Sequence, residues 1–134
     1  TWIGGGLVGT IEKMQPALKK DGLLLVGEPY WIKPPTAVIL ERMGMAENEF
    51  TSLAGTLARI ESTGMELVEM VLANQDSWDR YEATQWFTVD NWLRANANDP
   101  DAEALTAWIA ENKRVYLEYQ RAYLGWGVFV ARMK

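Results

Sequence analysis

Apolar side chains recur at the spacing of a helix in residues 7–20, where Leu7 and Ile11 lie on one face. The next apolar run, GLLLVGEPYW in residues 22–31, does not alternate with polar side chains. An unbroken run of this kind is typical of a strand covered on both faces, as parallel strands are in α/β domains. The pattern therefore predicts a helix followed by a strand whose aliphatic residues 23–26 are sandwiched between two layers.

Helical and strand patterns continue to alternate along the rest of the chain. The later elements expected are a loop with Pro29, Pro34 and Pro35 that ends the strand, a helix over residues 50–63, a strand over residues 65–73, a pair of helices over about residues 76–124, and a strand over residues 126–133. Gly64 is predicted to stop the second helix, and Asp76 or Ser77 to cap the third. The order predicts one α/β domain, residues 1–134, with three strands and a helical-pair insertion before the last strand.

The composition limits the chemistry that this chain can perform. Of its 134 residues, 49% are hydrophobic and 23% are charged, and it contains no Cys and no His. Thiol nucleophiles, imidazole bases and the usual zinc ligands are therefore excluded, and we expect no metal site. Carboxylates, hydroxyls, Lys, Arg, backbone groups or a bound cofactor must perform any reaction.

The charge bears on partners and location. The formal net charge is −5 and the pI is near 4.8. Negative charge repels nucleic acids and anionic membranes, so we expect neither as a partner. No apolar run approaches the roughly 20 residues of a membrane-spanning helix, and we expect a cytoplasmic protein. Because the chain begins at Thr1 without an initiator Met, we interpret it as a piece of something longer.

The strand over residues 22–31 becomes polar near its carboxyl end, at Glu28. In α/β folds this end of a parallel strand is the edge at which ligands bind, which makes Glu28, Tyr30 and Trp31 candidate site residues. The alternative is that Glu28 accepts backbone hydrogen bonds in a turn while Tyr30 and Trp31 pack beneath the helical pair. The sequence favours neither interpretation over the other.

A second candidate region is the segment DSWDRYE, which contains three carboxylates within two turns of a predicted helix. Asp79 and Glu82 are one turn apart, and paired carboxylates can divide the roles of acid and base or hold a metal. Acidic residues near a helix start also stabilise its free N–H groups, and capping is the preferred interpretation for Asp76 and Asp79.

Aromatic residues follow the same helix at regular spacing. Trp78, Tyr81 and Trp86 are more typical of a core than of a substrate cage, although an aromatic lining would suit a cationic sulfonium or amine. The expected buried stripe of the helical pair includes Trp78, Tyr81, Gln85, Trp86, Val89, Trp92 and Leu93 in its first helix, and Leu105, Trp108, Ile109 and Tyr116 in its second.

Three stretches carry a family resemblance: LKKDGLLLVGEPYW, SWDRYEATQW and YLGWGVFVARM. With them the chain resembles the carboxyl-terminal half of a class I S-adenosylmethionine-dependent methyltransferase. The resemblance implies part of a Rossmann-like sheet with strand order 3-2-1-4-5-7-6, in which the last strand is antiparallel. Residues 22–31 would then form the fifth strand, residues 65–73 the sixth and residues 126–133 the seventh.

The resemblance also implies a function for the longer protein, which is methyl transfer from S-adenosylmethionine to a small molecule. This chain would supply the substrate-side wall and would itself be inactive. The residues implied are Glu28 and Glu82 as catalytic groups, Tyr30, Trp31, Trp78, Tyr81 and Trp86 as substrate contacts, and Trp2 beside the cofactor.

The cofactor fingerprint of that family is missing from this chain. Its glycine-rich turn follows a strand, whereas the glycines at positions 4–6 have no strand before them, and a flexible helix entry is the preferred interpretation. We therefore expect little or no binding of S-adenosylmethionine by this chain alone.

Two other functions compete with this interpretation. One is a non-catalytic interaction module that self-associates through the exposed edge of strand 22–31 or through the first helix. The weaker one is the tail of a different α/β enzyme, such as a dehydrogenase or a hydrolase. The chain has no Ser in a nucleophile-elbow context, and this argues against the hydrolase.

Overall fold

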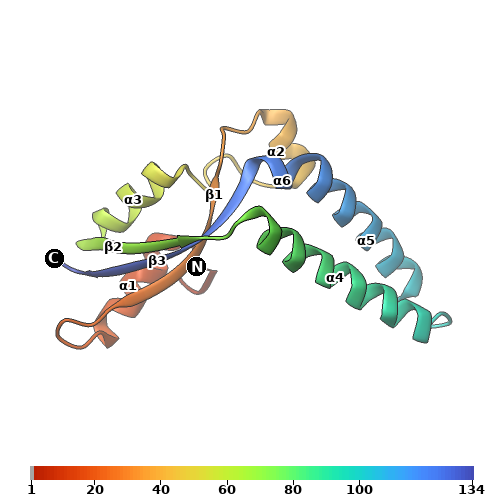
Figure 1. Cartoon of the computed structure of the whole chain (residues 1–134), viewed down its shortest axis with the longest axis horizontal. Coiled ribbons are helices and arrows are strands. Elements are labelled where there is room, and N and C mark those ends of the chain that lie inside the picture. Colours follow the sequence, from red (N-terminus) through yellow and green to blue (C-terminus); the bar gives the residue numbers. More distant parts are fainter. Residues whose placement is uncertain (1) are drawn as a thin grey trace.

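The computed structural model describes the backbone of residues 2–134 and the side chains of residues 3–134. In chain order the elements are η1 (Trp2–Gly4), α1 (Leu7–Met14), η2 (Gln15–Ala17), β1 (Leu24–Trp31), α2 (Ala37–Met43), α3 (Leu53–Ser62), β2 (Met65–Leu72), α4 (Gln75–Ala95), α5 (Ala102–Val115), η3 (Tyr116–Gln120, a π-helix), α6 (Arg121–Tyr123) and β3 (Leu124–Met133). Helices α4 and α5 run side by side away from the sheet and form what we term the arm (Figure 1). None of the described helices is long and apolar enough to cross a membrane.

The three strands form one sheet in the order β1-β3-β2. β3 is antiparallel to both neighbours, and its Phe129 lies opposite Val26 of β1 and Met70 of β2. β1 and β2 therefore run in the same direction on either side of β3. This confirms the predicted α/β architecture with three strands, of which the last is antiparallel.

The predicted elements form with shifted ends. The first helix ends sooner than predicted, at Met14, because Pro16 lacks the N–H that a helix interior needs and the chain continues as a 3₁₀ turn. The prediction that Asp76 or Ser77 caps α4 was wrong. Asn74 is the cap, and its Oδ1 accepts a hydrogen bond from the Ser77 backbone N–H at 2.8 Å.

The interpretation of the prolines was also wrong in part. Pro29 does not end β1, which continues to Trp31, because a residue without an N–H is tolerated on an edge strand. The loop predicted at Pro34 and Pro35 forms, and it leads into α2, which the sequence did not predict. Thr36 caps α2, and its Oγ1 accepts a hydrogen bond from Ile39 N–H at 3.4 Å. Gly64 follows α3 as predicted, with φ of 78°.

Two apolar clusters hold the elements together. The first joins α1 and α3 to the sheet and contains Leu7, Ile11, Leu24, Val26, Ile60, Met65, Phe129 and Ala131. The second joins the other end of the sheet to α2 and contains Trp31, Leu40, Met43 and Leu124, with Trp78, Tyr119 and Tyr123 packed against it. The arm is thus attached to the sheet through the second cluster.

The prediction that residues 23–26 are covered on both faces was wrong. Leu24 and Val26 are 1% and 6% exposed, whereas Leu23 and Leu25 are 52% and 59% exposed. Successive side chains of a strand point to opposite faces, and α1 and α3 pack with Leu24 and Val26. The unbroken apolar run therefore has one buried face and one face open to solvent in the described chain.

The buried stripe of the arm forms only in part as predicted. Ile109 and Tyr116 are buried as predicted, at 7% and 1% exposed, but Tyr81 and Trp108 are 61% and 50% exposed. Glu82, which was not in the predicted stripe, is 7% exposed. The predicted stripe placed a tyrosine where the structure buries a carboxylate. Aromatic residues of the arm therefore face solvent as well as the helix interface.

Candidate functional site

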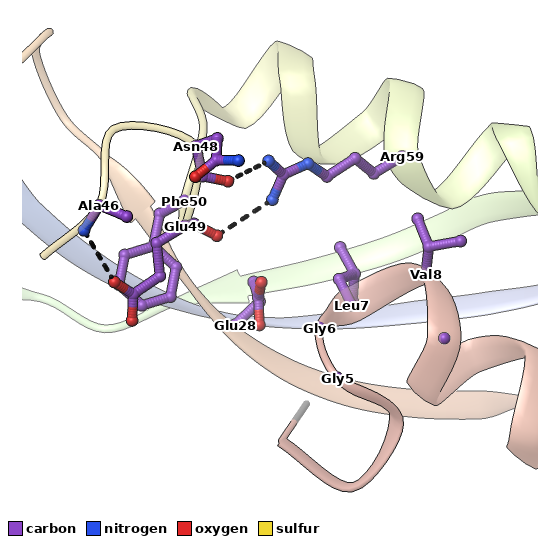
Figure 2. Close-up of a pocket in the computed structure, with 11 residues that line it drawn as sticks. Gly5, Gly6, Leu7, Val8, Glu28, Ala46, Asn48, Glu49, Phe50 and Arg59 are labelled. Carbon is purple, nitrogen blue, oxygen red and sulfur yellow. Dashed lines mark hydrogen bonds between the residues drawn. The ribbon is translucent and has the colours of Figure 1, made fainter.

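A pocket of about 730 Å³ opens between the start of α1, the carboxyl-terminal part of β1 and the loop that precedes α3 (Figure 2). Its lining residues are Gly5, Gly6, Leu7, Val8, Gly9, Glu28, Ala46, Asn48, Glu49, Phe50 and Arg59. The volume lies within the roughly 300–1,000 Å³ that is usual for small-molecule sites. Glu28 is the predicted catalytic residue that the structure places here.

Glu28 lies on β1, which fixes the direction of its side chain. By alternation it shares a face with Leu24 and Val26, which is the face that packs with α1 and α3. Figure 2 shows its carboxylate between Leu7 and Phe50. The residue is only 3% exposed, and its carboxylate therefore stands in surroundings that hold little water.

The glycines before α1 shape one wall of the pocket. Gly5 and Gly6 have φ angles of 74° and 127°, which favour glycine, and Gly6 is the residue before the first turn of α1. A Cβ on Gly4 would overlap the backbone of Gly9 and Thr10, so the two segments touch backbone to backbone. The prediction of a glycine helix entry is confirmed, and this entry also lines the pocket.

The opposite wall is the loop of residues 46–50, which Arg59 of α3 holds in place. Its Nη2 donates to the Asn48 carbonyl at 2.9 Å and its Nη1 to the Glu49 carbonyl at 3.3 Å. Glu49 Oε2 in turn accepts the Ala46 backbone N–H at 3.2 Å. Sequence reasoning did not identify these residues, since they come from a predicted loop and from a helix surface.

Trp31 fixes the end of the same loop. Its indole Nε1–H donates to the Phe50 carbonyl at 3.0 Å, and the two rings meet edge to face with centroids 5.8 Å apart. Trp31 is 7% exposed, and it therefore positions Phe50. Tyr30, also on β1, is 8% exposed, and its ring packs over Gly125 of β3. Tyr30 is therefore a core residue and does not line the pocket.

The other predicted residues lie at the base of the arm. Trp78 stacks between Tyr81 and Trp126 of β3, with centroids 5.8 and 6.1 Å apart. Trp86 Nε1–H donates to Asn112 Oδ1 of α5 at 2.8 Å. None of these side chains lines the pocket at Glu28.

Glu82 also belongs to the arm and does not line the pocket with Glu28. Burial raises its pKa above the usual range, because the charged form loses its hydration. Burial, the hydrogen bond to Asp79 and the charges of Asp79 and Glu82 together raise the pKa of Tyr116. A buried carboxyl with a raised pKa is suited to proton transfer, and this observation keeps Glu82 a candidate.

Asp79 is an ion-pair residue, not the helix cap that the sequence favoured. Its Oδ1 accepts hydrogen bonds from Tyr116 Oη at 2.6 Å, Arg121 Nε at 2.9 Å and Gln75 Nε2 at 3.1 Å. The Arg121 and Tyr116 hydrogen bonds lower the Asp79 pKa to about 2. This cluster joins α4 to η3 and α6.

The predicted cofactor contact of Trp2 rests on a side chain that lies outside the described residues. In the described chain, Gly4 ends η1 and Gly5 and Gly6 lead into α1, without the preceding strand of the dinucleotide and methyl-donor fingerprint. The residues present therefore do not fit the whole of S-adenosylmethionine.

Comparison with known proteins identifies relatives. No family model matches the chain. A SAM-dependent methyltransferase from Geobacter sulfurreducens, solved with S-adenosyl-L-homocysteine, is 43% identical with a TM-score of 0.94, and covers 100% of this chain and 55% of its own. A SAM-dependent methyltransferase from Thiobacillus denitrificans, also solved with S-adenosyl-L-homocysteine, is 41% identical with a TM-score of 0.92, and covers 99% of this chain and 54% of its own.

The uncharacterized protein YjhP of Escherichia coli K12 is 41% identical over 131 residues, which are 96% of this chain and 53% of YjhP. The chain is homologous to the carboxyl-terminal portion of SAM-dependent methyltransferases, as the sequence resemblance predicted. It spans about half the length of the relatives it matches.

Proposed function

We propose that this chain forms the acceptor side of an S-adenosylmethionine-dependent methyltransferase that acts on a small molecule. The observation that carries the proposal is the pocket at Glu28, which lies near the carboxyl end of β1 in a chain 41–43% identical to proteins of that class. The Rossmann-like arrangement of the complete sheet is part of the same proposal. The volume of the pocket, about 730 Å³, suits a small-molecule methyl acceptor.

The methyl donor supplies an electrophilic methyl group, and the residues of this chain prepare the acceptor. Glu28 would accept a hydrogen bond from the acceptor atom and take its proton, which frees the lone pair that reacts, while Leu7 and Phe50 exclude water from it. Positioning of this kind contributes much of the rate in bimolecular transfers, which explains how a chain without Cys or His can take part.

The test uses a longer protein that contains this chain together with the remainder found in its relatives. Methyl transfer from labelled S-adenosylmethionine is measured for the wild type, for Glu28→Gln and for Glu82→Gln. We expect Glu28→Gln to lower kcat/KM by about 10²-fold or more, the usual contribution of a general base, and Glu82→Gln to change it far less. A large loss in Glu82→Gln alone would move the reacting site to the arm.

Self-association is a second candidate function, and two observations favour it. Leu23, Leu25 and Val71 are 52–60% exposed, and the register places Leu25 and Val71 on one face of the sheet. β1 pairs with β3 alone among the described strands, so its other edge can accept a strand. α1 packs Leu7 and Ile11 into the core, which makes the strand edge the more suitable surface.

Sedimentation velocity tests this second candidate. A self-associating module sediments as a dimer at micromolar concentration, and Leu25→Lys returns it to a monomer because a charged side chain on an edge strand opposes pairing with a second strand. A monomeric wild type at that concentration would argue against self-association.

A further inference from the structure

We infer that the pocket at Glu28 takes its ligand as a small cationic amine. This inference rests on the proposed function, because it names the acceptor class of the same pocket. It is carried by the charges, the ring and the volume that the lining residues provide.

The charged groups of the pocket favour a cation. Its lining contains the carboxylates of Glu28 and Glu49 and the guanidinium of Arg59. The Arg59 guanidinium donates two hydrogen bonds to the carbonyls of Asn48 and Glu49, so these N–H groups bind the loop and not a ligand. The side-chain carboxylates outnumber the side-chain cations, so the field around Glu28 and Glu49 attracts positive charge.

The position of Glu28 makes this preference strong. Its side chain is 3% exposed and stands between Leu7 and Phe50 (Figure 2). Attraction between opposite charges grows as water is excluded, and a hydrogen bond from an ammonium to a carboxylate is about twice as strong as one between neutral groups. A neutral alcohol of the same shape can also donate a hydrogen bond to the carboxylate, but it gains no attraction between two full charges.

Phe50 adds a second attraction for the same ligand. Its ring lines the pocket and is held edge to face by Trp31. The face of an aromatic ring attracts ammonium groups and their N-alkyl substituents. The ring therefore favours binding of an amine that carries small alkyl groups.

The opposite wall limits the rest of the ligand. α1 starts at the pocket, and its first N–H groups are donors for a carbonyl or carboxylate oxygen. An amine whose other end carries such an oxygen fits both walls. At about 730 Å³ the pocket holds a molecule of this size and excludes a folded peptide.

The test is a calorimetric and NMR titration of this chain with three probes of equal size: n-propylamine, n-propanol and propionate. We expect propylamine to bind at least tenfold more tightly than the other two and to shift the amide signals of Gly5, Gly6 and Glu28. Glu28→Gln should remove the tenfold preference, and Phe50→Leu should weaken amine binding severalfold. Glu66→Gln, an exposed carboxylate on β2, should leave it unchanged.

Equal binding of the amine and the alcohol by the folded wild type would overturn the inference, and so would an unchanged preference in both pocket variants. Circular dichroism of each variant confirms that it is folded, and Phe50→Leu provides the test if Glu28→Gln unfolds. The titration contains no methyl donor. Amine binding without methyl transfer by the longer protein would therefore refute only the proposed function, and transfer restricted to hydroxyl acceptors would refute only this inference.

Discussion

Arg121 and Asp79 form a two-point ion pair across 42 residues, with Nε–Oδ1 at 2.9 Å and Nη2–Oδ2 at 3.0 Å. Asp79 lies in the second turn of α4, and Arg121 lies just before β3. The pair therefore connects the beginning of the arm to the segment by which the chain returns to the sheet. Tyr116 donates a third hydrogen bond to the same carboxylate.

Replacing Asp79 with Asn should loosen this connection. The amide keeps the shape but loses the charge and one acceptor, and we expect the melting temperature to fall by roughly 2–6 °C. Differential scanning calorimetry measures it. The control is Asp90→Asn, which removes the exposed Asp90–Arg94 pair within one helix and should cost much less.

The same carboxylate predicts a pH dependence. Its pKa is lowered from 3.8 to about 2 in the folded protein, so its contribution is present above pH 3.8 and is lost as the pH falls through about 2. The stability difference between wild type and Asp79→Asn should therefore be largest near neutral pH and shrink between about pH 4 and pH 2. A difference that stays constant over this range would show that the ion pair does not stabilise the fold.

Glu82→Gln should raise the melting temperature at neutral pH, whereas Asp79→Asn should lower it. The pKa of Glu82 is raised by burial, so its ionisation destabilises the fold as the pH rises above the usual range of a carboxyl. We expect the Gln variant to melt higher than the wild type at pH 7, by a few degrees, and close to it at about pH 4. Thermal melts at the two pH values test this, and a variant that melts lower at pH 7 would contradict it.

Arg59→Ala should release the loop of residues 46–50. The substitution removes two hydrogen bonds to backbone carbonyls, worth about 1 kcal/mol each. Hydrogen exchange should quicken in this loop and nowhere else. Arg114→Ala is the matched control, since Arg114 makes only an exposed 3.5 Å pair with Glu111 among the interactions described.

Gly125→Ala should destabilise the sheet by about 1–3 kcal/mol, because a Cβ at this position would meet the ring of Tyr30. Urea denaturation gives the change in the free energy of unfolding. Combining it with Tyr30→Leu should cost less than the sum of the two single variants, since the smaller side chain makes room. Strictly additive effects would mean that the two side chains do not compete for space.

The sequence predicted the strands well because their signals are local. The run at β1, the glycine after α3 and the pattern at β3 each specify a short element without reference to the rest of the chain. The family resemblance then predicted the order of the strands, including the antiparallel position of β3. Composition and periodicity alone would not have given that order.

The features that were missed depend on contacts between distant residues. Leu23 and Leu25 look like Leu24 and Val26 in the sequence, and only the placement of α1 and α3 separates the buried pair from the exposed pair. In the same way, Asp79 resembles a cap until Arg121 is seen beside it. Glu28 was predicted from its place near the end of a strand, and it lines the pocket. Arg59 also lines the pocket, but it was missed because its contacts depend on the fold of a loop.

The most direct test of the central claim is a crystal structure of the longer protein with S-adenosyl-L-homocysteine and propylamine. We expect the sulfur of the cofactor product to face the pocket and the amine nitrogen to lie within hydrogen-bond distance of the Glu28 carboxylate. A sulfur directed at Glu82 and the aromatic residues of the arm, with the Glu28 pocket closed off from it, would contradict the account.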